Sequence, residues 1–273
     1  MKIKVTTCWI GIITAFLIIL PSCKSYNIKP NLIPQERFEL AKKMFNNRDF
    51  FEAKTQFKIL TLSNPGIQFI DEAQYYLAEC HFNLKEYIIA SDEYSRIIRL
   101  YPKSEWLDDA QYKIAICDFK LSPKPSLDQK YTILAVMNFQ RFLEDFPKSE
   151  YVPEAERLLK ICRNKLAEKE FKAGELYRKL NNYYAANVYF DSVLESYYDT
   201  KFAESALFWK SECLYKLDHR NEALKSFREL IEKYPKTKYK AKAISRLKEI
   251  QSKIMNVREA DGDAALSNQT KNN

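Results

Sequence analysis

One residue pattern recurs five times along this chain in a single register, and it constrains the fold more than any other feature. A small residue is followed twelve positions later by an alanine, and an aromatic residue comes four positions after that. In the third copy the first spacing is twenty, because eight residues are inserted. The five triplets are Ala41/Ala53/Phe57, Ala78/Ala90/Tyr94, Ala115/Ala135/Phe139, Gly174/Ala186/Phe190 and Ser211/Ala223/Phe227. Such a repeat predicts helical hairpins that stack in a row, because each hairpin buries its apolar face against the next.

The pattern also has a physical logic within each copy. A small residue on the first helix (helix A) and an alanine on the second (helix B) let two backbones cross closely. Four of the aromatic residues are followed eight positions later by a proline, which ends helix B because it has no N–H to donate. These residues are Pro65, Pro102, Pro147 and Pro235, and Tyr198 takes the fifth place. The period of about 34 residues is that of a tetratricopeptide repeat (TPR), so we predict an all-α protein, a five-repeat TPR superhelix (α-solenoid).

Two departures from the repeat organise the rest of the chain. Ala155, Leu159, Cys162 and Leu166 form a helical stripe with no breaker before Gly174, which predicts one long helix from about Pro153 to Leu180. The prolines in Ser122–Ser126 predict a loop. We therefore expect the first three repeats in residues 33–147. We place the long connector helix, the last two repeats and a basic C-terminal helix in 148–258, and a disordered tail in 259–273.

The N-terminus has the pattern of a bacterial export signal. Lys2 and Lys4 precede an apolar stretch, Val5 to Leu20, that is shorter than the roughly 20 residues of a membrane-spanning helix. Leu20-Pro-Ser-Cys23 closes this stretch and resembles the lipobox of bacterial lipoproteins, whose cysteine is acylated. We expect residues 1–22 to be a lipoprotein signal peptide, Cys23 to carry the lipid, and residues 23–32 to be a tether. The alternative is a plain signal peptide with an incidental cysteine.

No residue pattern points to an active site, a metal site or a cofactor. Cys80, Cys117, Cys162 and Cys213 each follow an alanine by seven residues on a helix A stripe, which indicates free, buried thiols. His81 and His219 lie far apart in sequence, and we expect a core role for His81. There is no G-x-S-x-G, no P-loop and no dinucleotide fingerprint. We expect no enzyme, no cofactor and no nucleic acid as a partner.

Aromatic residues form two rows along the A helices. The first row lies three residues before each small position, and the second lies four residues after it. The first row is Phe38, Tyr75, Tyr112, Phe171 and Phe208, and the second is Phe45, Phe82, Phe119 and Tyr215, with Arg178 in the fourth repeat. One interpretation is packing between neighbouring A helices, and the other is a groove that binds a partner peptide.

Charged residues near the C-terminus leave similar alternatives open. Lys210 occupies a stripe position that is apolar in other repeats, so its stem either snorkels or its charge faces a partner. Eight Lys and Arg but one acid, Glu249, lie between Lys236 and Arg258. This run is a solvated helix face or a contact for an acidic partner or lipid headgroups.

Lipobox, five repeats and a long central helix together resemble the BamD (YfiO) family, lipoproteins of the outer-membrane β-barrel assembly (BAM) machine. The most specific segments are Phe146-Pro-Lys-Ser-Glu-Tyr151, Arg163-Asn-Lys-Leu-Ala-Glu-Lys-Glu170 and Tyr197-Tyr-Asp-Thr200. The resemblance implies a non-enzymatic scaffold, anchored through Cys23 on the periplasmic face of the outer membrane. Its implied partners are the POTRA region of a BamA-like barrel protein at the C-terminal repeats, unfolded outer-membrane β-barrel proteins at the N-terminal repeats, and other BAM lipoproteins.

The chain departs from the family pattern at the contact with BamA. The basic residue that family members use there falls near Tyr215 and Lys216 in this chain. Two other classes of protein remain open. One is a periplasmic TPR adaptor lipoprotein of another envelope complex. The other is a SusD-type nutrient-binding lipoprotein, which the short insertion argues against.

Overall fold

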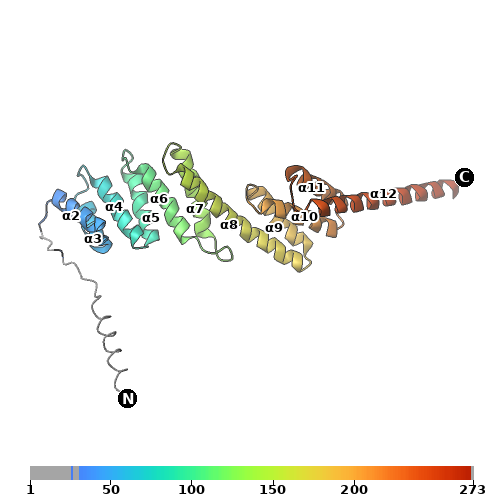
Figure 1. The fold of residues 1–273 in the computed structure, drawn as a ribbon, viewed down its shortest axis with the longest axis horizontal. Coiled ribbons are helices and arrows are strands. Elements are labelled where there is room, and N and C mark those ends of the chain that lie inside the picture. The colour runs from blue at the N-terminus through green and yellow to red at the C-terminus, as the bar shows by residue number, and fades with distance from the viewer. Residues whose placement is uncertain (1–25, 27–30, 272–273) are drawn as a thin grey trace, which may run out of the picture.

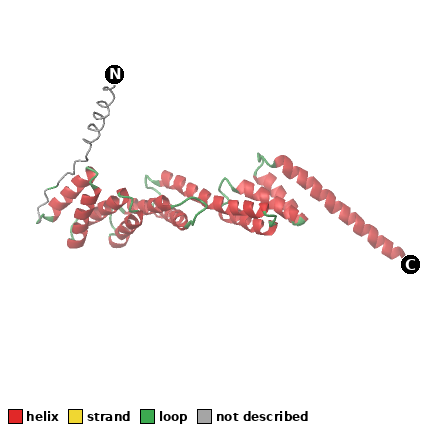
Figure 2. Ribbon diagram, turned by 90° about the horizontal axis from the view of Figure 1, so that it is seen from below, coloured by secondary structure: helices red, strands yellow, loops and turns green. Residues whose placement is uncertain are grey.

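The fold is an all-α superhelix of five stacked hairpins, as the repeat pattern predicts. The computed structural model describes Tyr26 and residues 31–271, and within that part it contains 11 α-helices and no strand (Figures 1 and 2). The hairpins are α2(Pro34–Asn46)/α3(Phe50–Ser63), α4(Ile70–Asn83)/α5(Tyr87–Leu100), α6(Leu107–Leu121)/α7(Lys130–Asp145), α8(Val152–Lys179)/α9(Tyr183–Ser196) and α10(Ala203–Lys216)/α11(Arg220–Lys233). A last helix, α12(Lys240–Lys271), follows the fifth hairpin and projects from the end of the row.

The residue triplets form the crossing points of the hairpins. Every alanine among them is fully buried, and so is every aromatic member. Gly174 shows why this position requires a small side chain, since a Cβ added there would lie 2.6 Å from the Phe190 ring. In the fifth hairpin, Ser211 donates a hydrogen bond to the Ser226 hydroxyl at 2.8 Å. The pattern therefore marks the positions at which the backbones of helices A and B approach each other closely within each hairpin.

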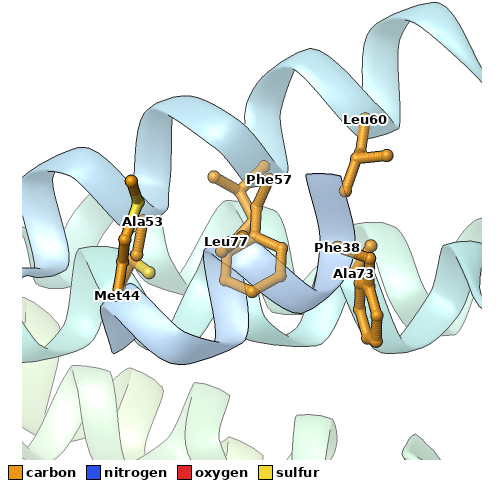
Figure 3. Close-up of a cluster of buried hydrophobic side chains, with 9 residues drawn as sticks. Phe38, Met44, Ala53, Phe57, Leu60, Ala73 and Leu77 are labelled. Atoms are coloured by element: carbon orange, nitrogen blue, oxygen red, sulfur yellow. The ribbon is translucent and has the colours of Figure 1, made fainter. Parts of the chain in front are cut away.

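The core runs along the row as a series of clusters, one at each hairpin. In the first cluster, Phe57 and Leu60 from α3 pack against Phe38 from α2 and Leu77 from α4 (Figure 3). A cluster thus combines one hairpin with the A helix of the next. This is the reason that repeats stabilise one another in sequence order.

The turn between helices A and B has the same backbone conformation in four repeats. Arg48, Lys85, Asn181 and Asp218 each lie seven residues after the small position and have φ near +60°. In the first turn, the Asp49 N–H donates to the Met44 carbonyl at 2.9 Å, which is the bond of a Schellman motif. The third repeat lacks this residue because the insertion starts there.

The junctions between repeats contain a hydrogen bond that the repeat pattern does not predict. Ser104 accepts from the Trp106 N–H at 3.2 Å and donates to Asp71, in the first turn of the preceding A helix, at 2.6 Å. Ser149 and Thr237 bind Asp108 and Glu204 in the same way, at 3.0 and 2.5 Å. Each hydroxyl accepts a hydrogen bond from the backbone at the start of the helix that follows. They also tie one repeat to the one before it.

Helix α8 joins the two groups of repeats and confirms the predicted long connector. Its first half packs in the third cluster through Ala155 and Leu158, and its second half packs in the fourth cluster through Phe171. The loop between α6 and α7, residues 122–129, rests on the same helix. Lys165 donates to the Ser122 hydroxyl at 2.7 Å, and Lys169 donates to the Leu127 carbonyl at 3.0 Å.

The two ends of the chain differ in what the structure describes. The signal peptide, Cys23 and most of the tether lie outside the described residues, so those assignments stay predictions. At the other end, α12 continues to Lys271, where we expected a disordered tail from residue 259. Residues 259–271 contain no proline, and Gly262 weakens a helix by about 1 kcal/mol relative to alanine without ending it. None of the described helices is both long and apolar enough to cross a membrane.

Candidate partner-binding surfaces

The first aromatic row packs between repeats. All five rings are buried, with exposed fractions between 1% for Phe208 and 8% for Tyr75, Tyr112 and Phe171. Each ring meets an aromatic residue at the start of the next A helix. The closest stacks are Tyr75 on Trp106 at 4.3 Å, Tyr112 on Tyr151 at 4.5 Å and Phe208 on Tyr239 at 4.0 Å between ring centroids. Phe38, Tyr75 and Tyr112, which we considered for peptide binding, therefore lie in the core.

The second row is half-buried and follows a different contact rule. In three of the repeats, the second-row residue contacts the residue that lies two positions before the small residue of the next repeat. The pairs are Phe45 with Tyr76 (5.1 Å between centroids), Phe82 with Lys113 (4.8 Å from Nζ to the ring centroid) and Arg178 with Trp209 (3.9 Å from Cζ to the centroid). Tyr76, Lys113 and Trp209 share one position in the repeat register, but the register alone does not predict that this position contacts the second row.

The N-terminal rings lie among ion pairs that cross from one A helix to the next. Lys42 binds Glu72 at 2.9 Å, and Lys113 binds Glu79 at 2.6 Å. Lys42 also lies 5.2 Å from the ring centroids of Phe38 and Tyr76. We define the N-terminal groove as Phe45, Phe82 and Phe119 with these flanking charges. Its rings are partly exposed and lie beside lysine side chains, a surface suited to an apolar or aromatic peptide side chain.

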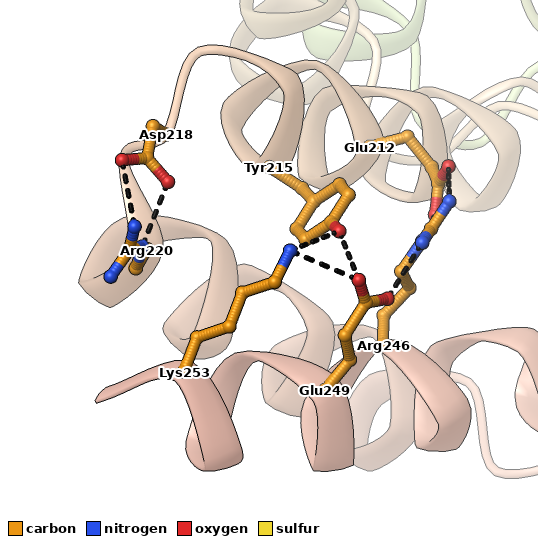
Figure 4. Close-up of polar contacts among 7 residues, drawn as sticks. All are labelled: Glu212, Tyr215, Asp218, Arg220, Arg246, Glu249 and Lys253. Atoms are coloured by element: carbon orange, nitrogen blue, oxygen red, sulfur yellow. Dashed lines mark hydrogen bonds and ion pairs between the residues drawn. The ribbon is translucent and has the colours of Figure 1, made fainter. Parts of the chain in front are cut away.

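The C-terminal candidates behave differently, because α12 covers one of them (Figure 4). Tyr215 donates a hydrogen bond to Glu249 of α12, accepts one from Lys253 at 2.9 Å, and has the Arg246 guanidinium 4.3 Å from its ring centroid. Arg246 also binds Glu212 at 3.0 Å. The hydrogen bond from Tyr215, together with Arg246 and Lys253, lowers the pKa of the Glu249 carboxyl to about 2. The ring of Tyr215 is thus part of the α10–α12 contact.

The two lysine candidates also differ. Lys210 forms an ion pair with Asp191 of α9, so its charge has a partner within the chain. Lys216 is exposed at the end of α10. Of the two, Lys216 is the side chain that an incoming protein can reach without breaking an ion pair.

Two of the three segments that carry the family resemblance, those that contain Arg163 and Asp199, meet in space. Arg163 of α8 donates two hydrogen bonds to Asp199, at 2.9 and 2.5 Å, and a third to the Ser196 carbonyl at 2.9 Å. Its guanidinium lies 5.8 Å from the Tyr197 ring centroid. These contacts hold the end of α9 against α8, so this signature is a structural clamp on the fourth repeat.

The cysteines and His81 have structural environments. Cys80, Cys117, Cys162 and Cys213 are free and buried, as predicted. Burial raises the pKa of these thiols, to about 11 for Cys162 and about 12 for the other three, so thiolate is scarce at neutral pH. His81 is buried and its Nδ1 lies 2.6 Å from Glu86, which confirms its core role. The described residues contain no cluster of His, Cys, Asp and Glu that could hold a metal ion.

Comparisons with known proteins agree with the repeats. The family model described as YfiO, outer membrane lipoprotein, matches residues 30–222. No curated protein sequence matches the chain significantly.

Several solved structures are similar in their helical repeats. The thermophilic TPR protein TTC0263 of Thermus thermophilus is 16% identical, with 79% of this chain and 99% of that chain covered and a TM-score of 0.34. The TPR2AB domain of yeast Sti1, solved as a pHSP90 complex, is 15% identical, with 83% and 86% covered and a TM-score of 0.41. A TPR protein from Parabacteroides merdae is 17% identical, with 86% and 79% covered and a TM-score of 0.35.

Proposed function

The chain belongs to the YfiO family of outer membrane lipoproteins, and from that membership we propose that it is a non-enzymatic scaffold of the β-barrel assembly complex. In this role it docks the POTRA region of a BamA-like protein, works beside other BAM lipoproteins, and helps deliver unfolded β-barrel proteins to the outer membrane. The observation that carries the proposal is the family match, because it spans the first four hairpins, the connector α8 and helix α10.

The N-terminal groove is the proposed site for unfolded barrel proteins. Phe82 and Phe119 are half-buried, so part of each ring is already desolvated and part remains accessible. The Lys165 ammonium, 6.0 Å from the Phe119 centroid, adds positive charge beside the rings, whereas the Lys113 ammonium over Phe82 is paired with Glu79. An extended segment that ends in an aromatic residue and a carboxylate would match both properties.

The C-terminal repeats are the proposed site for the POTRA region. Lys216 is exposed there, whereas Tyr215 and Lys210 are engaged within the chain. We therefore assign direct contact to Lys216, and to Tyr215 and Lys210 the role of shaping the surface around it.

The tether is proposed to hold the first hairpin close to the membrane. Tyr26 donates a hydrogen bond to Asp49 and accepts one from Asn47 at 3.1 Å, so it binds the turn between α2 and α3. Cys23, the proposed acylation site, precedes Tyr26 by three residues, and three residues span at most about 11 Å. The backbone of Tyr26, whose hydroxyl binds this turn, would then lie within that reach of the lipid surface on the periplasmic face.

Two measurements test the proposed function. Purification of the acylated protein from its own membranes should recover a POTRA-containing barrel protein, and depletion of the protein should lower the folded barrel content of the outer membrane. Recovery of a different envelope complex, with barrel content unchanged, would favour the adaptor alternative.

The groove is tested separately with a labelled peptide that ends in an aromatic residue. The variant Phe45→Ala/Phe82→Ala should weaken peptide binding by at least about tenfold, because it removes two partly desolvated rings. Phe51→Ala is the matched control, since Phe51 is an exposed phenylalanine on helix α3. A double variant that folds and binds the peptide normally would refute the groove.

A further inference from the structure

A pocket lies between the second and third repeats, where α5, α6 and α7 come together, away from the N-terminal groove and from α10. It holds about 350 Å³, within the range of about 300–1,000 Å³ that is typical of small-ligand sites. Its apolar walls include Ile98, Ile114 and Leu134, and its polar lining includes Arg99, Gln111, Asp118, Asn138 and Arg141. The pocket thus combines apolar surface with several groups that can form hydrogen bonds.

A hydrogen bond of the second repeat is missing at this pocket. Gln74, four residues before the small position, donates to Glu93, three residues after the alanine, at 2.7 Å. Gln111 and Asn138 occupy these two positions in the third repeat, but Asn138 donates instead to Asp118, at 2.7 Å. The Nε2 of Gln111 is left without a partner among the described residues, although only 4% of Gln111 is exposed. A buried, unpaired donor is costly, which favours an acceptor from outside the chain.

The arginines of the pocket lack an acid for a related reason. In the second repeat, Arg96 forms an ion pair with Glu93 at 3.1 Å. Arg141 is the counterpart of Arg96 in the third repeat, where Asn138 takes the place of the acid. Within the part of the chain that the structure describes, neither Arg141 nor Arg99 forms an ion pair, and both are exposed at the rim. Two cations and a buried amide donor therefore face one space without an anion.

The charged groups are separated along the length of the pocket. Neighbouring helices run antiparallel, so Arg99 near the end of α5 and Arg141 near the end of α7 lie beside the start of α6, which contains Gln111. Asp118 follows Gln111 by seven residues on α6, which places it about 10 Å farther along the helix. Its carboxylate accepts a hydrogen bond from Asn138, and 6% of the residue is exposed. The pocket is therefore dipolar, with donors and cations at one end and a carboxylate at the other.

This arrangement restricts the chemistry of a ligand. A simple anion would be repelled by Asp118, whereas a ligand with an amine at its far end would donate to that carboxylate. The donors at the other end come from three helices, and a phosphate ester presents oxygens in several directions, unlike the two oxygens of a planar carboxylate. A phosphate ester that also bears an amine satisfies both ends.

We propose that this pocket binds a phosphoethanolamine group, with the phosphate at Arg99, Arg141 and Gln111 and the amine at Asp118. Such a group is found as a phosphodiester in a lipid headgroup and as a free phosphomonoester, and the test separates these two sources. The inference goes beyond the proposed function, because binding of this ligand does not depend on which complex the protein joins.

The test is a calorimetric titration of the acylated protein in a non-ionic detergent. The soluble probes are glycerophosphoethanolamine, glycerophosphocholine and O-phosphoethanolamine. Glycerophosphoethanolamine should bind saturably, and glycerophosphocholine should bind at least about tenfold more weakly, because its quaternary ammonium has no N–H to donate to Asp118. Binding of the diester supports a lipid headgroup as the source, and binding of O-phosphoethanolamine alone supports the free monoester. Equal binding of the ethanolamine and choline diesters, or no saturable binding of any probe, would overturn the proposal.

Equivalent variants in two repeats separate binding from stability. Gln111→Leu should weaken binding by at least about tenfold but change the free energy of unfolding little, because the lost donor has no partner in the free protein. Gln74→Leu is the matched control. It should destabilise the protein, because it removes the hydrogen bond to Glu93, and it should leave binding unchanged.

Variants at the rim keep the test valid if a substitution at Gln111 fails to fold. Arg141→Gln changes an exposed side chain and should weaken binding by about tenfold, whereas Arg228→Gln, at an exposed arginine of α11, should not. Asp118→Asn should remove the preference for ethanolamine over choline. An Arg141→Gln protein that folds and binds the preferred probe normally would contradict the proposal, whatever the pull-down recovers.

Discussion

The three N-terminal hairpins and the two C-terminal hairpins share one residue pattern, but the rings of their second aromatic row contact different neighbours. Phe82 in the second repeat has one cation, Lys113, over its ring and remains partly accessible. Tyr215, the equivalent residue of the fifth repeat, lies beneath Arg246 and Lys253 of α12 and bonds to Glu249 (Figure 4). The last repeat has no sixth hairpin to stack on, and α12 takes that place.

Position along the row therefore decides what an equivalent residue does. A ring within the row is covered on one side by the next A helix and keeps an accessible edge. A ring at the end of the row must be covered by a capping element, as terminal repeats generally are. The N-terminal half thus offers aromatic surface, whereas the C-terminal half offers charge.

The largest expected effect compares the first-row rings of the two halves. Phe208→Ala should cost about 3–5 kcal/mol of unfolding free energy, because it leaves a cavity where the ring now stacks on Tyr239 at 4.0 Å. Phe38→Ala should cost less, since Phe38 keeps a 4% exposed fraction and packs in the first hairpin, which has a neighbour on one side only. Urea denaturation followed by circular dichroism measures both. An equal or larger cost at Phe38 would remove the distinction between the halves.

A smaller effect tests the close crossing of the fourth hairpin. Gly174→Ala should destabilise by about 1–3 kcal/mol despite the better helix propensity of alanine, because the new Cβ meets the Phe190 ring at 2.6 Å. Leu176→Ala on the same helix is the control, and its 56% exposed fraction predicts little change. A stabilised Gly174→Ala protein would mean that the ring can move aside.

The turns give a third comparison, with the opposite sign. Arg48→Gly and Lys85→Gly in the N-terminal half should each stabilise by about 0.5–1 kcal/mol, because a side chain at positive φ is strained and glycine is not. Asn181→Gly and Asp218→Gly in the C-terminal half should gain less, since Asn and Asp tolerate this conformation. Thermal unfolding ranks the four variants. Equal gains in both halves would contradict the argument.

The smallest effect concerns the α12 network and its pH dependence. The pKa of Glu249 is lowered to about 2 in the folded protein, below the unfolded value of about 4.3. The contribution of Glu249 to stability is therefore present above pH 4.3 and is lost as the pH falls from there toward 2. Because its side chain is 38% exposed, solvent screening keeps this contribution below about 1 kcal/mol. An NMR titration of the Glu249 carboxyl measures the pKa, and Tyr215→Phe should raise it.

Much of the fold could be predicted because the repeat pattern is local and periodic. The triplet of Ala78, Ala90 and Tyr94 fixes a hairpin through nearby residues, and five copies in register fix the stack. The bonds between Ser104 and Asp71 could not be predicted in this way. They join side chains 33 positions apart, and no local signal marks that contact.

The candidate site was predicted less well, for a related reason. Periodicity placed Phe38 and Phe45 on the same side of one helix, but it did not say which ring the next repeat covers. The contact of Phe82 with Lys113 and that of Arg178 with Trp209 required the offset between neighbouring A helices. The pocket that α5, α6 and α7 line is likewise invisible in a single repeat.

The residue pattern was enough to establish that this chain is a row of paired helices, because small residues and rings at fixed spacing allow close crossing and little else. Which equivalent positions are buried, paired or left open depended on the folded stack. Stacking brings each A helix against the next at a set offset, and α12 closes only one end. Tyr215 and Phe82 occupy the same place in the repeat and are both half-buried, yet Tyr215 bonds to Glu249 and Lys253 of α12, whereas Phe82 has the Lys113 ammonium over its ring.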